Sequence, residues 1–153
     1  MTIYVDGDAC PVKDETYRVA ARYSIPVVLV GNSPLHVPGG GGVTFVQVPG
    51  GSDIADDWIA DAAGPGVIVT TADLPLAGRA LARGAIAIDF RGLEFTPDAI
   101  GGLLASREVA QLLRATTSYS GGPMPFHQRD RGRFMGKLDE VINRLRHRAA
   151  GEH

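Results

Sequence analysis

The sequence predicts an α/β domain in which helices cover both faces of a mostly parallel sheet. Short apolar runs alternate with segments of helical periodicity along the chain, and this alternation is typical of parallel sheets. The run at 27–30 is four apolar residues in succession, as in a strand buried on both faces. A length of 153 residues, with 44% hydrophobic and 21% charged residues, suits one globular domain spanning 1–153.

The apolar runs and their flanking residues set the expected elements. Pro11 suits a helix start, where its missing N–H would have no partner in any case. Ser52 is a good N-cap for the helix expected at 52–63, and Gly84 ends the helix expected at 75–83. Strands are expected at 3–5, 27–30, 43–48, 67–70 and 85–88. Helices are expected at 12–23, 52–63, 75–83, from 96 to 114, and at 130–148.

Composition indicates a cytoplasmic protein. Cys10 is the only cysteine, so no intrachain disulfide can form, which fits a reducing compartment. The first residues lack the basic stretch and apolar run of a signal peptide. Acidic residues and Gly-Pro pairs interrupt every apolar stretch, so we expect no membrane span. The oligomeric state stays open, with a homodimer as one alternative.

Charge is distributed unevenly between the two parts of the chain. Residues 1–106 carry 6 Lys/Arg against 12 Asp/Glu, a net −6, and residues 107–153 carry 9 against 5, a net +4. The asymmetry favours an acidic site that faces a basic helical segment at 107–148. The competing interpretation is a basic helix that is merely solvated.

Carboxylates follow successive predicted strands. In open parallel sheets, ligands bind beyond the carboxyl ends of the strands, so acids placed there converge on one edge. The spacing i, i+3, i+4 in the second group places at least two of its acids on one helix face. The acids are Asp6 and Asp8 after the first strand, Asp53, Asp56 and Asp57 after the third, and Asp73 after the fourth.

Converging carboxylates repel one another unless a cation compensates them. Hard divalent cations bind carboxylate oxygens and water, and no Cys/His pair has a zinc spacing, so Mg²⁺ or Mn²⁺ is the expected cofactor. Such an ion activates water and stabilises charge on a transferring phosphoryl group. The candidate metal ligands are Asp6, Asp8, Asp53 and Asp73.

Each side chain also has a structural interpretation. Asp53 could serve only the helix dipole, and Asp8 could cap the helix that begins near Pro11. Asp56 or Asp57 could be plain solvated surface. The hydroxyl groups at 70 and 71 could approach a metal, although a strand end needs no such reason. Trp58 is expected to pack on the sheet.

Four ordered segments resemble the YaiI/YqxD family of largely uncharacterised bacterial proteins. They are VDGDACPV (5–12), SDIADDWI (52–59), VIVTTADLPLA (67–77) and GGPMPFHQRDRGRFMGKLD (121–139). That family is thought to belong to the PIN-like superfamily, whose better-known members are metal-dependent ribonucleases. The resemblance implies a three-layer PIN-like fold with strand order 3-2-1-4-5. It also implies catalytic acids at Asp6, at Asp53, at Asp56 or Asp57, and at Asp73.

The function that this resemblance implies is metal-dependent hydrolysis of single-stranded RNA. The basic segment would bind the RNA through Arg129, Arg131, Arg133 and Lys137. One alternative is a non-catalytic RNA-binding module of the same fold. Another is a phosphohydrolase of the haloacid dehalogenase type, because Asp6-Gly7-Asp8 after a strand looks like its nucleophile motif; that motif, however, expects Thr or Val where Cys10 stands.

Overall fold

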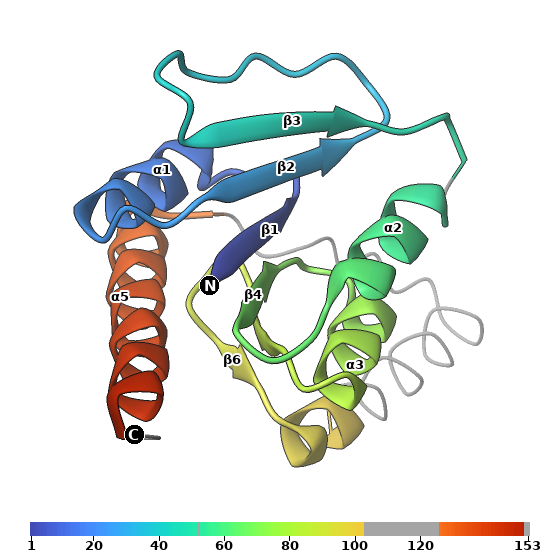
Figure 1. Ribbon diagram of the computed structural model, residues 1–153. Helices are drawn as coiled ribbons and strands as arrows, with labels where there is room; N and C mark the ends of the chain where they lie inside the picture. The colour runs from blue at the N-terminus through green and yellow to red at the C-terminus, as the bar shows by residue number, and fades with distance from the viewer. Residues whose placement is uncertain (52, 103–125, 152–153) are drawn as a thin grey trace.

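The computed structural model describes residues 1–51, 53–102 and 126–151, which form one six-stranded sheet in the order β3-β2-β1-β4-β5-β6 (Figure 1). Its strands are β1 (Thr2–Asp6), β2 (Val27–Gly31), β3 (Val43–Gln47), β4 (Val67–Thr70), β5 (Ile86–Ile88) and β6 (Glu94–Phe95). The first five pair in parallel, and only β6 is antiparallel to its neighbour. The predicted order of the first five strands is therefore confirmed.

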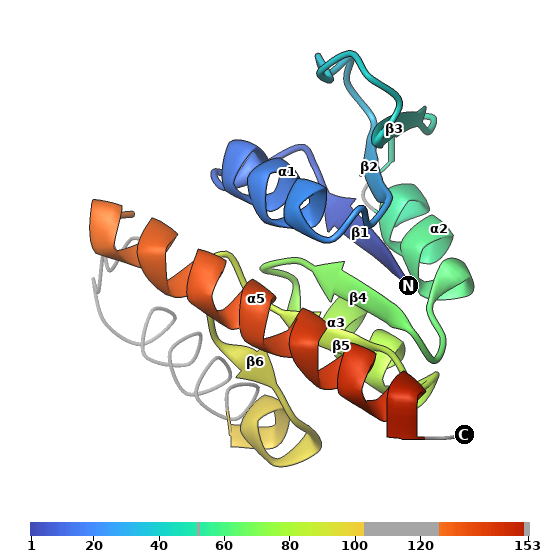
Figure 2. The same ribbon diagram turned by 60° about the vertical axis from the view of Figure 1, so that its left-hand side comes forward.

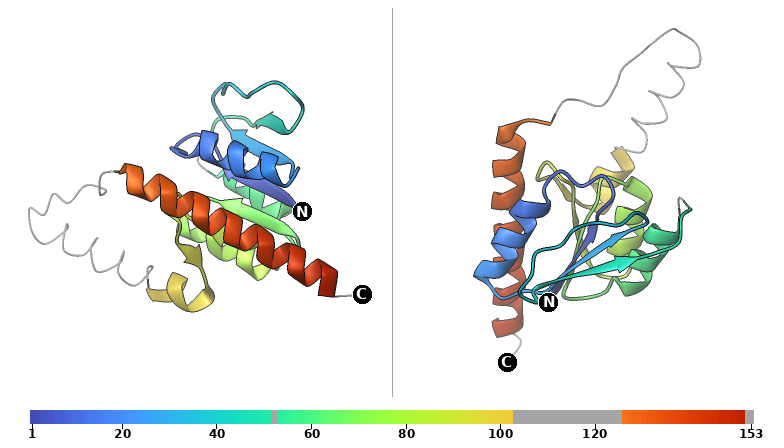
Figure 3. Two further views of the ribbon diagram at one scale, coloured as in Figure 1. Left: turned by 90° about the vertical axis from the view of Figure 1, so that its left-hand side faces the viewer. Right: turned by 90° about the horizontal axis from the view of Figure 1, so that it is seen from above.

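Helices cover both faces of this sheet, which gives three layers (Figure 3). On one face lie α1 (Lys13–Arg22) and α5 (Gln128–Gly151); on the other lie α2 (Ile54–Ala62) and α3 (Leu74–Ala82). Alternation along β1 serves both layers, because Ile3 and Val5 belong to the α1/α5 core and Tyr4 packs with the α2/α3 core. The predicted α/β class with a mostly parallel sheet is confirmed.

Element boundaries differ from expectation at a few points. The strand β6 was not predicted, because two residues are too few to show a period. The helix α2 begins at Ile54 with Asp53 as its N-cap residue, and the expected cap at 52 lies outside the described residues. Of the helix expected from 96 to 114, residues 97–102 are helical and the remainder lies outside the described part. At 128–151, α5 is longer than predicted.

The helix α5 is fixed to the domain by a buried stripe and by ion pairs at its sides. Phe134, Leu138, Val141 and Ile142 are fully buried. Figure 2 shows α5 lying beside α1 and crossing the part of the sheet that holds β4 and β5. Its side chains also pair with other elements, in Arg22–Asp139 at 3.2 Å and Arg144–Glu94 at 2.7 Å. No helix among the described ranges is long and apolar enough to cross a membrane.

The turn between β5 and β6 contains a glycine whose backbone packs directly against the backbone of α5. Gly92 has φ +91°, and a Cβ built there would lie 2.7 Å from the backbone C and O of Arg133 in α5. Both the left-handed backbone and the close approach of two main chains therefore require glycine.

We predict that Gly92→Ala lowers the free energy of unfolding by at least about 2 kcal/mol, from backbone strain and overpacking together. The matched control is Gly78→Ala, which lies inside α3 with nothing within 4 Å of the added Cβ. It should stabilise by about 0.5–1 kcal/mol. Urea unfolding measures both. A Gly92→Ala protein as stable as the wild type would show that α5 does not pack on this turn.

Candidate active site at the carboxyl edge of the sheet

A hydrogen-bonded chain links the ends of the two central strands. Asp6 is the last residue of β1, and its Oδ2 accepts a hydrogen bond of 2.9 Å from Oγ1 of Thr71, the residue after β4. The Thr71 oxygen in turn accepts a 3.0 Å bond from the backbone N–H of Asp73. Asp73 caps α3, where its Oδ1 accepts from the N–H of Leu76 at 2.8 Å. One hydroxyl therefore holds two predicted site acids in fixed positions.

Asp56 on α2 belongs to the same electrostatic group. Its pKa is raised to about 6, first by burial and then by the negative charges of Asp73, Asp6 and Asp53, with Arg79 opposing them. The pKa of Asp6 is also raised, first by burial and then by the charges of Asp73 and Asp8, against the Thr71 hydrogen bond. Asp6 and Asp56 are thus harder to ionise because they are partly buried and because other negative charges lie near them.

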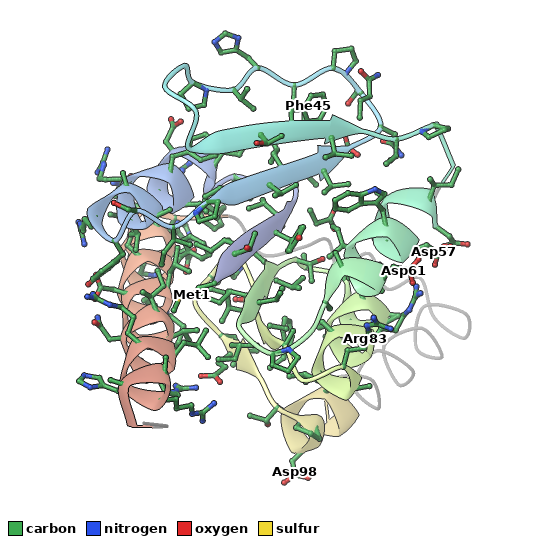
Figure 4. The ribbon with its side chains drawn as sticks, in the orientation of Figure 1. Met1, Phe45, Asp57, Asp61, Arg83 and Asp98 are labelled. Atoms are coloured by element: carbon green, nitrogen blue, oxygen red, sulfur yellow. The ribbon has the colours of Figure 1, made fainter. Side chains whose placement is uncertain are left out.

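The other predicted acids have different surroundings. Asp8 accepts hydrogen bonds from the loop after β2, at 2.9 Å from Asn32 N and 2.9 Å from Ser33 Oγ. Burial would raise the pKa of Asp8, but these bonds lower it overall. Asp57 is exposed and forms an ion pair with Arg79 at 2.7 Å, and Figure 4 shows it beside Asp61 at the rim of the molecule. Asp53 is exposed at the N-cap of α2, with no side-chain capping bond.

The carboxylate oxygens of Asp6 and Asp73 are suitable ligands for a cation that binds few protein groups. Among the described residues, no group of three or more Asp, Glu, His or Cys side chains is arranged to hold one metal ion. A site shared by Asp6, Asp53 and Asp73 therefore stays a prediction. Mg²⁺ needs less, because it keeps several waters and binds through one or two carboxylates. Asp6 and Asp73 each have only one oxygen in a hydrogen bond with the described residues.

The start of α5 lies at this same edge of the sheet. The basic side chains of α5 differ in whether they already have partners within the protein. Arg131 donates to the Pro11 carbonyl at 2.6 Å and to Glu15 at 3.0 Å, so it joins α5 to α1. Lys137 pairs with Glu140 within α5. In the described part of the chain, Arg129 and Arg133 are exposed and form no ion pair. Of the four predicted RNA-binding residues, these two are the ones available to a ligand.

An aromatic clamp at the start of α5 is a feature that the sequence did not reveal. The guanidinium groups of Arg91 and Arg131 lie 5.4 Å and 5.1 Å from the centroid of the Phe126 ring. Arg91 also pairs with Asp130 at 3.2 Å, and Asp130 accepts the N–H of His127 at 2.8 Å. Arg91 is 35 positions from Phe126 and 39 from Asp130 in the sequence, so no local pattern could have predicted these two contacts.

Comparison with known proteins places the chain in a family. The family model described as "Uncharacterized BCR, YaiI/YqxD family" matches residues 4–144. The chain belongs to this YaiI/YqxD family. Among its curated relatives, the UPF0178 protein of Rhodospirillum centenum is 49% identical over 150 residues, covering 95% of this chain and 97% of that protein. The UPF0178 proteins of Parvibaculum lavamentivorans (48%) and Caulobacter sp. strain K31 (46%) cover 95% and 94% of this chain, and 96% and 95% of their own lengths. No solved structure shows significant similarity to the chain.

The raised pKa of Asp56 predicts a specific dependence of stability on pH. A folded-state value near 6, against 3.8 for an ordinary Asp, means that the folded state binds this proton more tightly than the unfolded state. The stabilising contribution is therefore complete below pH 3.8 and is lost as pH rises through 6. Asp56→Asn should be more stable than the wild type at pH 7 by about 1 kcal/mol, after allowance for solvent screening.

Urea unfolding at pH 7 and pH 4 in the presence of a chelator measures this difference, which should disappear at the lower pH. The control Asp98→Asn removes an exposed carboxylate that Figure 4 shows far from α2, and its effect should stay within about 0.5 kcal/mol. An Asp56→Asn variant less stable than the wild type at pH 7 would mean that Asp56 is not under repulsion from its neighbours.

Proposed function

We propose that this protein hydrolyses phosphodiester bonds of single-stranded RNA with the help of Mg²⁺ or Mn²⁺. The observation that carries the proposal is that the Thr71 hydroxyl joins Asp6 to Asp73 at the carboxyl edge of the sheet, where their charges and that of Asp56 repel one another. Clustered carboxylates with raised pKa values are typical of functional sites, and a bound divalent cation would offset the repulsion between them. The cation would polarise the phosphodiester and lower the pKa of bound water.

The residues divide the chemistry between them. Asp6 and Asp73 would hold the cation through the oxygens that Thr71 and Leu76 leave open. Thr71 holds the carboxylate of Asp6 and the backbone of Asp73, and the N–H of Leu76 holds the Asp73 carboxylate, which is the preorganisation that a reacting site needs. Asp56, whose pKa is near 6, would accept a proton from the attacking water at neutral pH. Arg129 and Arg133 would contact phosphates of the RNA on the α5 side.

We predict that Asp6→Asn lowers the rate of RNA cleavage roughly 100-fold or more, since the transition state loses a preorganised charge. It should also erase stabilisation by Mn²⁺. At 100 times the dissociation constant, Mn²⁺ should stabilise the wild type by about 2.7 kcal/mol, or roughly 5–10 °C in Tm. The Tm without metal should hold or rise, because the Asn oxygen can still accept the Thr71 hydrogen bond.

Melting curves with and without Mn²⁺, beside a cleavage assay on a mixed RNA pool, test this. The control is Asp61→Asn, an exposed carboxylate on the same helix as Asp56, which should leave cleavage unchanged. Suppose that the wild type gains nothing from metal and cuts no RNA, while Asp6→Asn lowers Tm by several degrees. Asp6 is then structural, and a non-catalytic RNA-binding module replaces the nuclease.

A second prediction concerns the basic side of the site. Replacing Arg129 and Arg133 with Ala should weaken RNA binding and reduce the slope of log K against log salt by about 1.4, since each lost phosphate contact to a single strand removes about 0.7. Arg131→Ala is the contrasting variant, because it removes the bonds to Pro11 and Glu15 and should lower Tm. If the slope is unchanged in the double variant, Arg129 and Arg133 do not contact phosphates of the RNA, and α5 is simply a solvated basic helix.

A further inference from the structure

An exposed aromatic pair lies on the α2 side of the sheet. The rings of Tyr4 in β1 and Trp58 in α2 have centroids 5.8 Å apart and planes tilted by 56°. Trp58 was expected to pack on the sheet, and through Tyr4 it does, but 37% of its surface stays exposed. Large apolar side chains with this much exposure are few among the described residues, and another of them, Ile54 at 38%, lies one helical turn before Trp58.

On the side of β2 and β3, the neighbours of this pair are apolar. Val28 pairs with Tyr4 across β1 and β2, and both side chains are only partly buried, as is Val46 of β3. Figure 1 shows α2 beside the ends of β1 and β2, with β3 beyond them at the rim of the sheet. Apolar residues that are only partly buried therefore lie on the α2 side of β1, β2 and β3, the side of the sheet on which Trp58 packs.

The pair is also adjacent to the candidate active site. Tyr4 and Asp6 lie on the same face of the same strand, separated by two residues or roughly 6.6 Å. Asp56 and Trp58 point to different flanks of α2, and the flank that carries Trp58 faces Tyr4. A polymer whose reacting phosphate is at Asp6 and Asp73 would therefore carry a neighbouring unit across the start of α2 toward Trp58.

We propose that Trp58, supported by Tyr4, is a stacking platform for a nucleobase of the single-stranded substrate, next to the reacting phosphate. This inference rests on the proposed function. The exposed charged side chains on α2 and at its N-cap are the carboxylates of Asp53, Asp57 and Asp61, of which Asp57 is paired with Arg79. The charge of this helix therefore repels an anionic backbone. Base stacking on an aromatic face is indifferent to these charges and to sequence, so it can hold the chain where phosphate contacts cannot.

Trp58 is the only tryptophan of the chain, so its fluorescence reports on the platform directly. The probes are an oligoadenylate and an abasic ribose-phosphate chain of the same length, titrated into the wild-type protein without divalent cation and again with Mg²⁺. The oligoadenylate should quench the emission saturably, and the abasic chain should not. Cleavage is followed separately on gels, so a failure of hydrolysis and a failure of stacking are read independently.

Variants extend the test through the anisotropy of labelled RNA. Trp58→Ala should weaken binding of the oligoadenylate roughly 5- to 150-fold, the effect of one lost base–aromatic stack, with little change for the abasic chain. Trp58→Phe should restore most of the affinity. Leu93→Ala removes another exposed apolar side chain, 43% exposed after β5, and should change nothing.

Three results would overturn the platform. One is equal binding and quenching by the abasic chain, which leaves only phosphate contacts. Another is no response of Trp58 to either probe. The third is emission that changes with protein concentration alone, which would mean that a second copy of the chain covers Trp58.

Discussion

The hydroxyl of Thr71 connects the two strands on which the candidate site is built. It donates to Asp6 at the end of β1 and accepts the N–H of Asp73 at the start of α3. Because the central strands are parallel, their carboxyl ends and the helix starts that follow all meet at one edge. The repulsion among Asp6, Asp56 and Asp73 is a direct consequence of this topology. The fold tolerates it because the opposite layer, α1 with α5, supplies an independent apolar core.

The basic C-terminal segment illustrates how charge can be misleading when it is counted without structure. Its net positive charge suggested a continuous surface for RNA. In the described part of α5, Arg131 and Arg144 instead form ion pairs with Glu15 and Glu94 on other elements. Such partly buried pairs fix the position of a helix more than they attract a distant ligand. Of the four residues predicted to bind RNA, the two that are exposed without an ion pair in the described part of the chain are Arg129 and Arg133, near the start of α5.

Sequence reasoning predicted the fold better than the site. Apolar runs bounded by Gly and Pro predicted the five parallel strands within a residue or two, because buried strands leave a strong local signal. The rule that parallel strands deliver their ends to one edge placed Asp6 and Asp73 together. It could not separate Asp56 from Asp57, since adjacent helical residues differ only in the direction of their side chains. The structure turns Asp57 toward Arg79 and leaves Asp56 near the other acids.

The contacts that remained hidden from the sequence are the long-range ones. The exposure of Trp58 depends on how much of the sheet α2 covers, and the stacking of Arg91 on Phe126 depends on the path of α5. Neither leaves a periodic trace in the chain, because both are set by packing between elements that are distant in sequence.

The central claim is that one divalent cation binds where β1 and α3 meet. An anomalous-difference map from crystals grown with Mn²⁺ tests it most directly. We expect a peak within coordination distance of carboxylate oxygens of both Asp6 and Asp73, with Thr71 still bonded to Asp6. A map with no peak at this edge, from crystals that contain Mn²⁺ at saturating concentration, would contradict the claim and leave the clustered acids without the ligand proposed for them.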